Sequence, residues 1–300
     1  MHARGVKIAM RMSKVSRIPT IWIAIVVAAG LGRASSQAVP RTDANSIQAH
    51  AQLKDKTRQG RIDVYFAGDS ITRRWGTSDA QYRDLLANWR QNFFGWNAAD
   101  FGWGGDTVQN VLWRLEDGEF DGVRPNVVVL MAGTNNIADT PRTAIDSRIV
   151  DEIASGIRAI LELVQHRAPE ATIVVMGITP RLDRQGGPSL APTIAAANAR
   201  IGALADGRRV RFLDLNGALA APDGAPHAGM TVDGLHLTVA GYQVWADALK
   251  PILTEILGPP ATTDHAPPPS GNPADKQPRV RLKADTVVLG NGRSRRLLRG

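Results

Sequence analysis

Four short segments of this sequence carry residue types that could perform acyl transfer. They are Gly68-Asp69-Ser70-Ile71-Thr72, Gly104-Gly105-Asp106-Thr107, Gly133-Thr134-Asn135-Asn136 and Asp233-Gly234-Leu235-His236-Leu237. Taken alone, each has an ordinary explanation, because Gly, Asp, Ser and Asn are favoured in turns and at helix starts. A single histidine is likewise most often a half-buried ring with its hydrogen bonds satisfied. Together, however, the segments supply a nucleophile, a base, an acid and donors for a developing oxyanion.

The requirements of the reaction assign a role to each residue. Acyl transfer needs a hydroxyl within hydrogen-bond reach of a base, and an acid that fixes the tautomer of that base. We predict Ser70 as the nucleophile, His236 as the base and Asp233 as the acid. The predicted oxyanion donors are the backbone N–H groups of Ser70 and Gly105 and the side-chain amide of Asn135. Removing one such donor typically costs about 10²- to 10³-fold in turnover.

These segments need a scaffold that brings them to one place. Between residues 61 and 257, short apolar runs alternate with helical stretches, which is typical of parallel βαβ units. We expect strands at 63–67, 98–102, 126–132, 172–178 and 210–215, and helices at 79–92, 107–116, 143–167, 191–205 and 239–257. The third and fourth strands are continuously apolar, so they belong at the sheet centre. The predicted fold is α/β, a three-layer α/β/α sandwich with its chemistry in loops at the carboxyl ends of the strands.

At this point the sequence resembles a known family. The stretch from Gly68 to about Leu257 is similar to the SGNH hydrolases of the GDSL type, whose four defining residues fall on Ser70, Gly105, Asn135 and His236, with Asp233 as the acid. The runs FGWGGDT at 101–107 and VLWRLEDGE at 111–119 resemble the catalytic subunits of platelet-activating-factor acetylhydrolases. The resemblance implies a flavodoxin-like sheet, hydrolysis of short acyl esters, commonly acetyl, and no metal or organic cofactor.

One departure from that pattern is Trp103, where the family more often has a smaller aliphatic residue. Our hypothesis is that Trp103, together with Trp75, lines the substrate pocket and restricts the acyl group to acetyl or a similar length. The alternative is that Trp103 packs under the loop, because a large aromatic side chain contributes heavily to any core.

Competing motifs fit less well. Residues 102–107 begin like a dinucleotide fingerprint but have Thr107 where the third glycine belongs. The Gly-x-Ser-x-Gly elbow of α/β-hydrolases does not occur. His50, His166 and His227 show no metal-ligand spacing, so no metal site is predicted. The sequence leaves open whether the acyl group goes to water or to a sugar hydroxyl, as in an acetyltransferase. A non-catalytic carbohydrate-binding module on the same scaffold also stays open.

The N-terminal segment predicts export. Basic residues precede an uncharged run at 18–32, and Ser36-Gln37-Ala38 offers a cleavage site. We therefore expect residues 1–38 to be a signal peptide cleaved near Ala38, with an uncleaved anchor as the alternative, and a periplasmic or extracellular protein. The chain has 0 cysteines, which excludes disulfides and thiolate metal sites.

Charge divides the rest of the chain. The net charge of +8 arises at the ends, since residues 1–38 hold six Lys/Arg and no acid, and residues 259–300 hold eight Lys/Arg against three Asp. The body is mildly acidic, so nucleic acid is not an expected partner. We expect a lead-in at 39–60, one catalytic domain at 61–258, and a disordered Pro-rich linker and basic tail at 259–300. That tail either associates weakly with the anionic cell envelope or is a solvated end without a role; the oligomeric state is not predicted.

Overall fold

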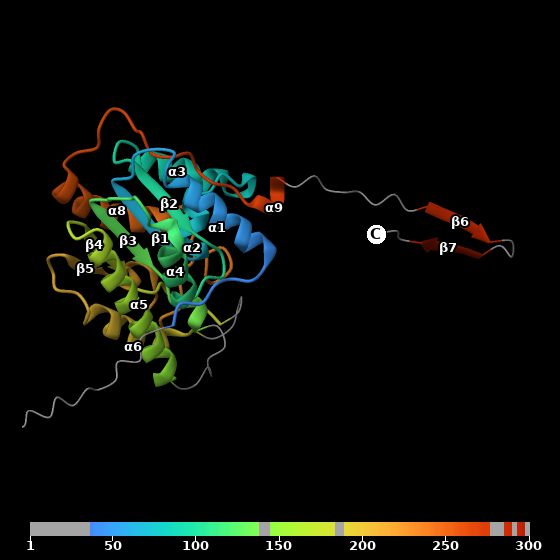
Figure 1. Ribbon diagram of the computed structural model, residues 1–300. Helices are drawn as coiled ribbons and strands as arrows, with labels where there is room; N and C mark the ends of the chain where they lie inside the picture. The colour runs from blue at the N-terminus through green and yellow to red at the C-terminus, as the bar shows by residue number, and fades with distance from the viewer. Residues whose placement is uncertain (1–36, 138–144, 184–188, 277–284, 290–292, 298–300) are drawn as a thin grey trace, which may run out of the picture. The chain divides into compact units, whose positions relative to one another are not determined.

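A five-stranded parallel sheet forms the centre of the domain (Figure 1). The computed structural model describes residues 37–137, 145–183 and 189–276 and the strands at 285–289 and 293–297. The predicted signal peptide lies outside these residues apart from Gln37 and Ala38. In the sheet, the order β2-β1-β3-β4-β5 is that of flavodoxin-like folds. The strands are β1 (Val64–Gly68), β2 (Ala98–Gly102), β3 (Val127–Met131), β4 (Thr172–Met176) and β5 (Val210–Leu213).

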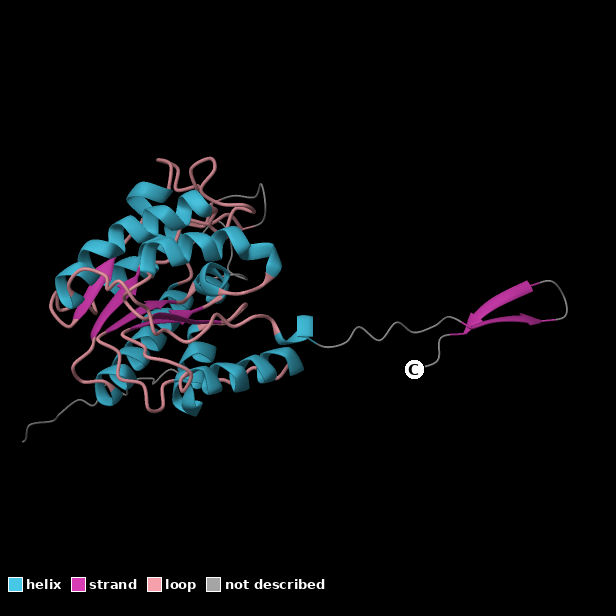
Figure 2. Ribbon diagram, turned by 90° about the horizontal axis from the view of Figure 1, so that it is seen from above, coloured by secondary structure: helices cyan, strands magenta, loops and turns pink. Residues whose placement is uncertain are grey.

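Helices cover both faces of the sheet, so the predicted three-layer α/β/α sandwich is confirmed (Figure 2). One face packs against α1 (Ala44–Lys56), α4 (Val108–Arg114), α5 (Ser147–Arg167) and α6 (Ala191–Gly202). The other packs against α2 (Ser70–Gly76), α3 (Arg83–Phe93), α7 (Asn216–Leu219) and α8 (Val239–Leu257). Successive strand residues alternate between the two cores, as the pleat requires: Tyr65 enters the first and Phe66 the second. As predicted, β3 and β4 are interior strands, apolar because helices bury both of their faces.

The second core is aromatic and joins the helices on either side of the site. The Phe66 ring lies 4.6 Å from that of Trp89 and 5.2 Å from that of Phe93. The Trp75 ring on α2 lies 4.8 Å from the Tyr242 ring on α8, in a stacked arrangement. Aromatic pairs of this kind contribute about 0.5–1.5 kcal/mol beyond the area that they bury. The core therefore fixes α2 and α8, the helices next to the two motifs that carry Ser70 and His236.

Helices α1 and α2 were not among the helices predicted from the sequence. Helix α1 lies in the lead-in, and α2 begins at Ser70 itself. Both start at an aspartate, because Asp43 accepts a hydrogen bond from the Ser46 N–H and Asp69 one from the Ile71 N–H. Shorter elements complete the domain: η1 (Ala80–Tyr82), η2 (Leu115–Glu119), η3 (Thr134–Asn136) and α9 (Pro273–Lys276).

The segment after α8 corrects the prediction of a disordered linker. Residues 258–276 lie along the domain as a strap, which we define as this segment. The Arg61 N–H donates to the His265 carbonyl at 2.9 Å, and the Ser78 N–H donates to the Ser270 carbonyl at 3.1 Å. The Asn272 N–H donates to the carboxylate of Asp79 at 2.6 Å. A Pro-rich chain loses little conformational entropy on ordering, so a few such bonds suffice to hold it, but its composition does not reveal them.

The C-terminal tail also contains regular backbone structure. Strand β6 (Asp285–Leu289) pairs antiparallel with β7 (Arg293–Leu297). The first of these strands contains the β-branched run Thr286-Val287-Val288, which favours extended backbone. Within the described parts of the chain, no helix has the length and apolar character needed to cross a membrane.

Candidate active site

Ser70 stands where β1 ends and α2 begins. The turn between them leaves no room for a side chain at Gly68, since a Cβ there would lie 2.2 Å from Thr72 Oγ1 and 2.4 Å from the Met131 carbonyl oxygen. Asp69 is fully buried and caps α2 by accepting the Ile71 N–H at 2.8 Å. The strand-to-helix turn thus presents the Ser70 hydroxyl at the carboxyl edge of the sheet, where ligands of this fold class bind.

Ser70, His236 and Asp233 form one continuous hydrogen-bonded chain. Ser70 Oγ lies 3.0 Å from His236 Nε2, and His236 Nδ1 lies 2.7 Å from Asp233 Oδ2. The other carboxylate oxygen, Asp233 Oδ1, accepts the backbone N–H of His236 at 2.8 Å and of Leu235 at 3.1 Å. Because the carboxylate accepts at Nδ1, the imidazole keeps its proton there and offers Nε2 as the acceptor for the serine proton. The structure brings together the three residues that the sequence predicted.

The electrostatics of the site keep the base neutral. Burial lowers the pKa of His236, the bond to Asp233 opposes this, and the positive charges of Arg74 and Arg181 lower it further, so the net shift is downward. For Asp233, burial raises the pKa, but the hydrogen bonds from the His236 N–H and ring outweigh it and hold the pKa below its ordinary value. At neutral pH the pair is therefore a neutral imidazole beside a carboxylate, which is the form that accepts a proton from serine.

The predicted oxyanion donors come from two further loops. Gly105 follows β2 and has a φ of +79°, a backbone conformation that favours glycine. The ideal Cβ position of its neighbour Gly104 lies 3.9 Å from Ser70 Cβ, so this loop borders the nucleophile. Asn135, in η3 after β3, donates from Nδ2 to the Asp106 carbonyl at 2.8 Å. That bond uses one of the two amide hydrogens of Asn135.

Asn136 has a different task from its neighbour. Its Oδ1 accepts the Val108 N–H at 3.1 Å, at the start of α4, and its Nδ2 donates to Gln109 Oε1 at 2.9 Å. Asn136 therefore fastens η3 to α4, which follows the Gly105 loop. This connection supports the relative position of Gly105 and Asn135.

Arg114 is a positioning residue that the sequence analysis missed. Its buried guanidinium donates to Asp106 Oδ2 at 2.6 Å and to the Gly68 carbonyl at 3.1 Å, and it pairs with Glu119. It thereby links the Gly105 loop to the end of β1, just before Ser70. Burial raises the pKa of Asp106 to about 6 against the opposing charge of Arg114. Breaking a buried pair of this kind costs about 3–5 kcal/mol. The sequence feature that could have indicated a buried arginine here is its position within the apolar run VLWRL.

A second buried acid lies next to the nucleophile. Burial raises the pKa of Asp69 to about 7, although the hydrogen bond from the Ile71 N–H opposes this shift. Its second oxygen, Oδ2, has no hydrogen-bond partner among the residues that the structure describes.

Across the same described residues, no group of three His, Asp or Glu side chains is arranged to hold a metal ion.

Trp75 does not border the substrate, which corrects that part of the hypothesis. Its side chain is 0% exposed, and its ring N–H donates to Asn88 Oδ1 at 2.9 Å within the aromatic core. The aromatic residue follows the nucleophile closely in the sequence, but it lies on the face of α2 that packs against α3 and α8. Its task is to position α2.

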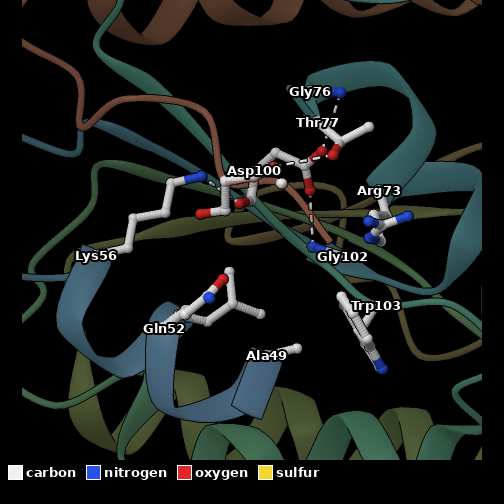
Figure 3. Close-up of a pocket in the computed structure, with 12 residues that line it drawn as sticks. Ala49, Gln52, Lys56, Arg73, Gly76, Thr77, Asp100, Gly102 and Trp103 are labelled. Carbon is white, nitrogen blue, oxygen red and sulfur yellow. Dashed lines mark hydrogen bonds between the residues drawn. The ribbon is translucent and has the colours of Figure 1, made fainter. Parts of the chain in front are cut away.

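Trp103 is buried, in agreement with the alternative that it is a packing residue, and its partner is α1. Its ring N–H donates to Ser46 Oγ at 2.8 Å, and the Arg73 guanidinium lies 4.7 Å above the ring. The ring lines a cavity together with Lys56 and Asp100, as Figure 3 shows. Burial lowers the pKa of Lys56 to about 8, and the Asp100 carboxylate opposes this. The residues lining the cavity include neither Ser70 nor His236.

Comparisons with known proteins agree with this geometry. Residues 66–244 match the sequence model of the GDSL-like Lipase/Acylhydrolase family. The human platelet-activating factor acetylhydrolase IB subunit alpha2 is 33% identical over 200 residues, which cover 65% of this chain and 77% of that subunit. The bovine subunit alpha1 is 32% identical over 236 residues, 77% of this chain and 92% of that subunit.

Solved structures show the same fold. A GDSL-like lipase from Bacteroides thetaiotaomicron superposes with a TM-score of 0.53 at 20% identity, covering 71% of this chain and 99% of its own. A Bacteroides fragilis protein gives 0.55 at 24% identity, with 72% and 99% covered. With its motifs in one hydrogen-bonded site and its sequence matched over residues 66–244, this chain belongs to the GDSL-like lipase/acylhydrolase family of SGNH hydrolases.

Proposed function

We propose that this protein hydrolyses carboxylic esters of short acyl groups, acetyl foremost, through an acyl-enzyme on Ser70. The observation that carries the proposal is the hydrogen-bonded chain from Ser70 Oγ through the His236 ring to Asp233, with links of 3.0 and 2.7 Å. These distances allow proton transfer without rearrangement of the side chains. The family to which the chain belongs comprises acylhydrolases, in agreement with this chemistry.

The proposed reaction has two halves. Ser70 Oγ attacks the ester carbonyl carbon while His236 Nε2 takes the hydroxyl proton, and the carbonyl π electrons move to oxygen. The tetrahedral intermediate collapses, His236 returns the proton to the leaving alkoxide, and the acyl group stays on Ser70. A water molecule then repeats the sequence, with His236 as its base, and releases the acid. Asp233 stays ionised throughout and stabilises the imidazolium that forms twice.

The oxyanion is stabilised by donors already in place. The proposed partners of the negative oxygen are the N–H groups of Ser70 and Gly105 and the second amide hydrogen of Asn135. Donors fixed by the fold need no reorganisation when charge develops, which is why they lower the barrier. The bonds of Asn135 to the Asp106 carbonyl and of Arg114 to the Asp106 carboxylate supply that rigidity.

The acetyl preference rests on sequence similarity. The curated relatives that match at 32–33% identity are named as acetylhydrolase subunits. The test is the rate on p-nitrophenyl acetate, butyrate and octanoate, with Ser70→Ala as the control. We expect the wild-type protein to cleave p-nitrophenyl acetate fastest of the three esters, and the variant to cleave none of them. Faster cleavage of octanoate would overturn the acetyl preference, and equal activity of Ser70→Ala would overturn the serine mechanism.

We further propose that the protein is exported and acts on acetylated glycans or lipids outside the cytoplasm. The basic residues before the uncharged run at 18–32 support this proposal. Acetate release from acetylated xylan, sialic acid, peptidoglycan and a short-chain phospholipid would identify the substrate class. Repeating the assay with a sugar acceptor separates hydrolysis from transfer, since transfer yields an acetylated acceptor in place of acetate. Detection of the protein only in the cytoplasm would contradict export.

A further inference from the structure

Arg41 reaches the oxyanion loop from the N-terminal lead-in. Its Nη1 donates to the Gly104 carbonyl at 3.1 Å and lies 3.4 Å from Asp106 Oδ1. The same nitrogen lies 3.1 Å from the position that a Cβ on Gly105 would occupy. The guanidinium therefore lies against the backbone of the residue whose N–H is the proposed oxyanion donor.

The contact acts on a single peptide group. The carbonyl of Gly104 and the N–H of Gly105 belong to the same planar amide and point in opposite directions. A donor fixed on the carbonyl oxygen therefore fixes the direction of the N–H. A charged donor also withdraws electron density from the amide, which makes its N–H a stronger hydrogen-bond donor.

Contacts on both sides of Arg41 hold it in place. Before it, the Val39 N–H donates to the Gln109 carbonyl at 3.1 Å, and Asn110 Nδ2 donates to the Val39 carbonyl at 2.9 Å, both on α4. After it, Arg41 Nη2 donates to Asp43 Oδ2 at 3.0 Å. Asp43 is itself fixed by accepting the Ser46 N–H at the start of α1.

We propose that Arg41 is a positioning residue that aims and polarises the Gly105 N–H of the oxyanion hole. The inference rests on the proposed function of Ser70. The proposal gives the lead-in segment before α1 a role in the reaction, although this segment lies outside the four motifs. A side chain at position 105 would strain a φ of +79° and crowd the guanidinium, because its Cβ would lie 3.1 Å from Arg41 Nη1.

Arg41 and Arg114 both contact the Asp106 carboxylate, but they bind different oxygens and differ in burial. Arg114 is buried and pairs with Oδ2 at 2.6 Å, so its loss removes the closer of the two arginines from the buried Asp106 carboxylate. The Arg41 side chain is 31% exposed and contacts Oδ1 at longer range, so its loss leaves Asp106 still paired. Substitution of Arg41 should therefore change the reaction more than the stability.

The experiment compares Arg41→Met and Arg41→Lys in the full chain on p-nitrophenyl acetate. We expect Arg41→Met to lower kcat about 10- to 100-fold, less than the loss of a whole donor, with KM unchanged within about twofold. Arg41→Lys should recover part of kcat, because an ammonium can still donate to the Gly104 carbonyl. The matched control is Arg58→Met, an exposed arginine on α1's C-terminal side that pairs with Asp55 and should leave kcat unchanged.

A second readout separates oxyanion stabilisation from structural damage. An acetyl-sized trifluoromethyl ketone adds to Ser70 and places an oxyanion in the hole, so its inhibition constant should rise by the same factor as kcat/KM falls. Unchanged kcat, a loss confined to KM, or unchanged inhibitor affinity in Arg41→Met would each overturn the inference. These outcomes are distinct from failure of the proposed function, in which the wild-type protein itself cleaves no ester and forms no Ser70 adduct.

Discussion

The buried hydroxyl of Tyr242 donates a 2.6 Å hydrogen bond to the backbone carbonyl of Ile71. Ile71 directly follows the nucleophile, and Tyr242 lies on α8 in the segment that follows the base His236. Trp75 stacks on the same tyrosine ring. The distance between nucleophile and base is thus set by a contact in the hydrophobic core as well as by the bond between them.

We predict that Tyr242→Phe lowers both stability and turnover. Loss of this bond should reduce the free energy of unfolding by about 1 kcal/mol, measured by urea denaturation. Because the substitution removes a hydrogen bond that holds α2 and α8 together, kcat on p-nitrophenyl acetate should fall several-fold. The control is Tyr65→Phe, which removes a buried 2.9 Å bond to the Glu119 carbonyl on the other face of the sheet. It should cost similar stability and leave kcat unchanged; equal kcat losses in both variants would refute the link.

Asp233→Asn should inactivate the base without unfolding the protein. The asparagine Oδ1 can still accept the N–H groups of Leu235 and His236, but its amide would donate to His236 Nδ1. The ring proton would then move to Nε2, where it blocks acceptance of the serine proton. We expect kcat to fall by about 10³- to 10⁴-fold. Asp223→Asn, in an exposed loop where Oδ1 caps Ala225, serves as the control. A loss below tenfold would show that Asp233 does not set the tautomer.

The pH dependence of kcat/KM follows from the pKa of His236. Burial and the charges of Arg74 and Arg181 lower this pKa below its ordinary value of 6.5. Activity needs the neutral ring, so it should rise with pH through a midpoint below 6.5 and stay high at neutral pH. Removing a nearby positive charge raises the pKa, so Arg74→Met should move this limb to higher pH. Arg61→Met, at an exposed site beside Asp63, should leave it in place. A limb that moves to lower pH would contradict this electrostatic account.

Truncation distinguishes the strap from the tail. Ending the chain after Lys276 keeps the bonds of His265, Ser270 and Asn272 to the domain, so we expect an unchanged Tm. Ending it after Gly258 removes them and uncovers apolar surface beside Trp89 and Phe93, so Tm should fall by about 5 °C or more. Differential scanning calorimetry on both truncated chains provides the comparison. Equal Tm values would show that the strap does not stabilise the domain.

Much of the fold and the central residues of the site could be predicted from sequence, for identifiable reasons. Strands β3 and β4 are continuously apolar, so both of their faces must be buried and they must lie inside the sheet. Ser70, His236 and Asp233 could be predicted because together they form a set of nucleophile, base and acid. Turns alone would not require that combination. The seven-residue α2 escaped prediction because its start at Ser70 coincides with the turn.

The remaining site residues depend on contacts between distant segments. Arg41 and Arg114 act through partners on distant segments. The apolar run around Arg114 indicates burial but not which groups it binds, and Arg41 could equally have faced solvent. Trp75 was assigned to the substrate pocket, whereas the face of α2 that it occupies is decided by packing against Tyr242. The strap was misread for the same reason, since its hydrogen bonds go to Arg61, Ser78 and Asp79.

The central claim is that Ser70 becomes covalently acylated with His236 as its base. Intact-protein mass spectrometry after incubation with a fluorophosphonate tests it directly, followed by peptide mapping of the adduct. The account predicts a single adduct on Ser70 of the wild-type protein, absent in Ser70→Ala and strongly slowed in His236→Gln. A folded wild-type protein that gains no adduct, or an adduct that persists in Ser70→Ala, would contradict it.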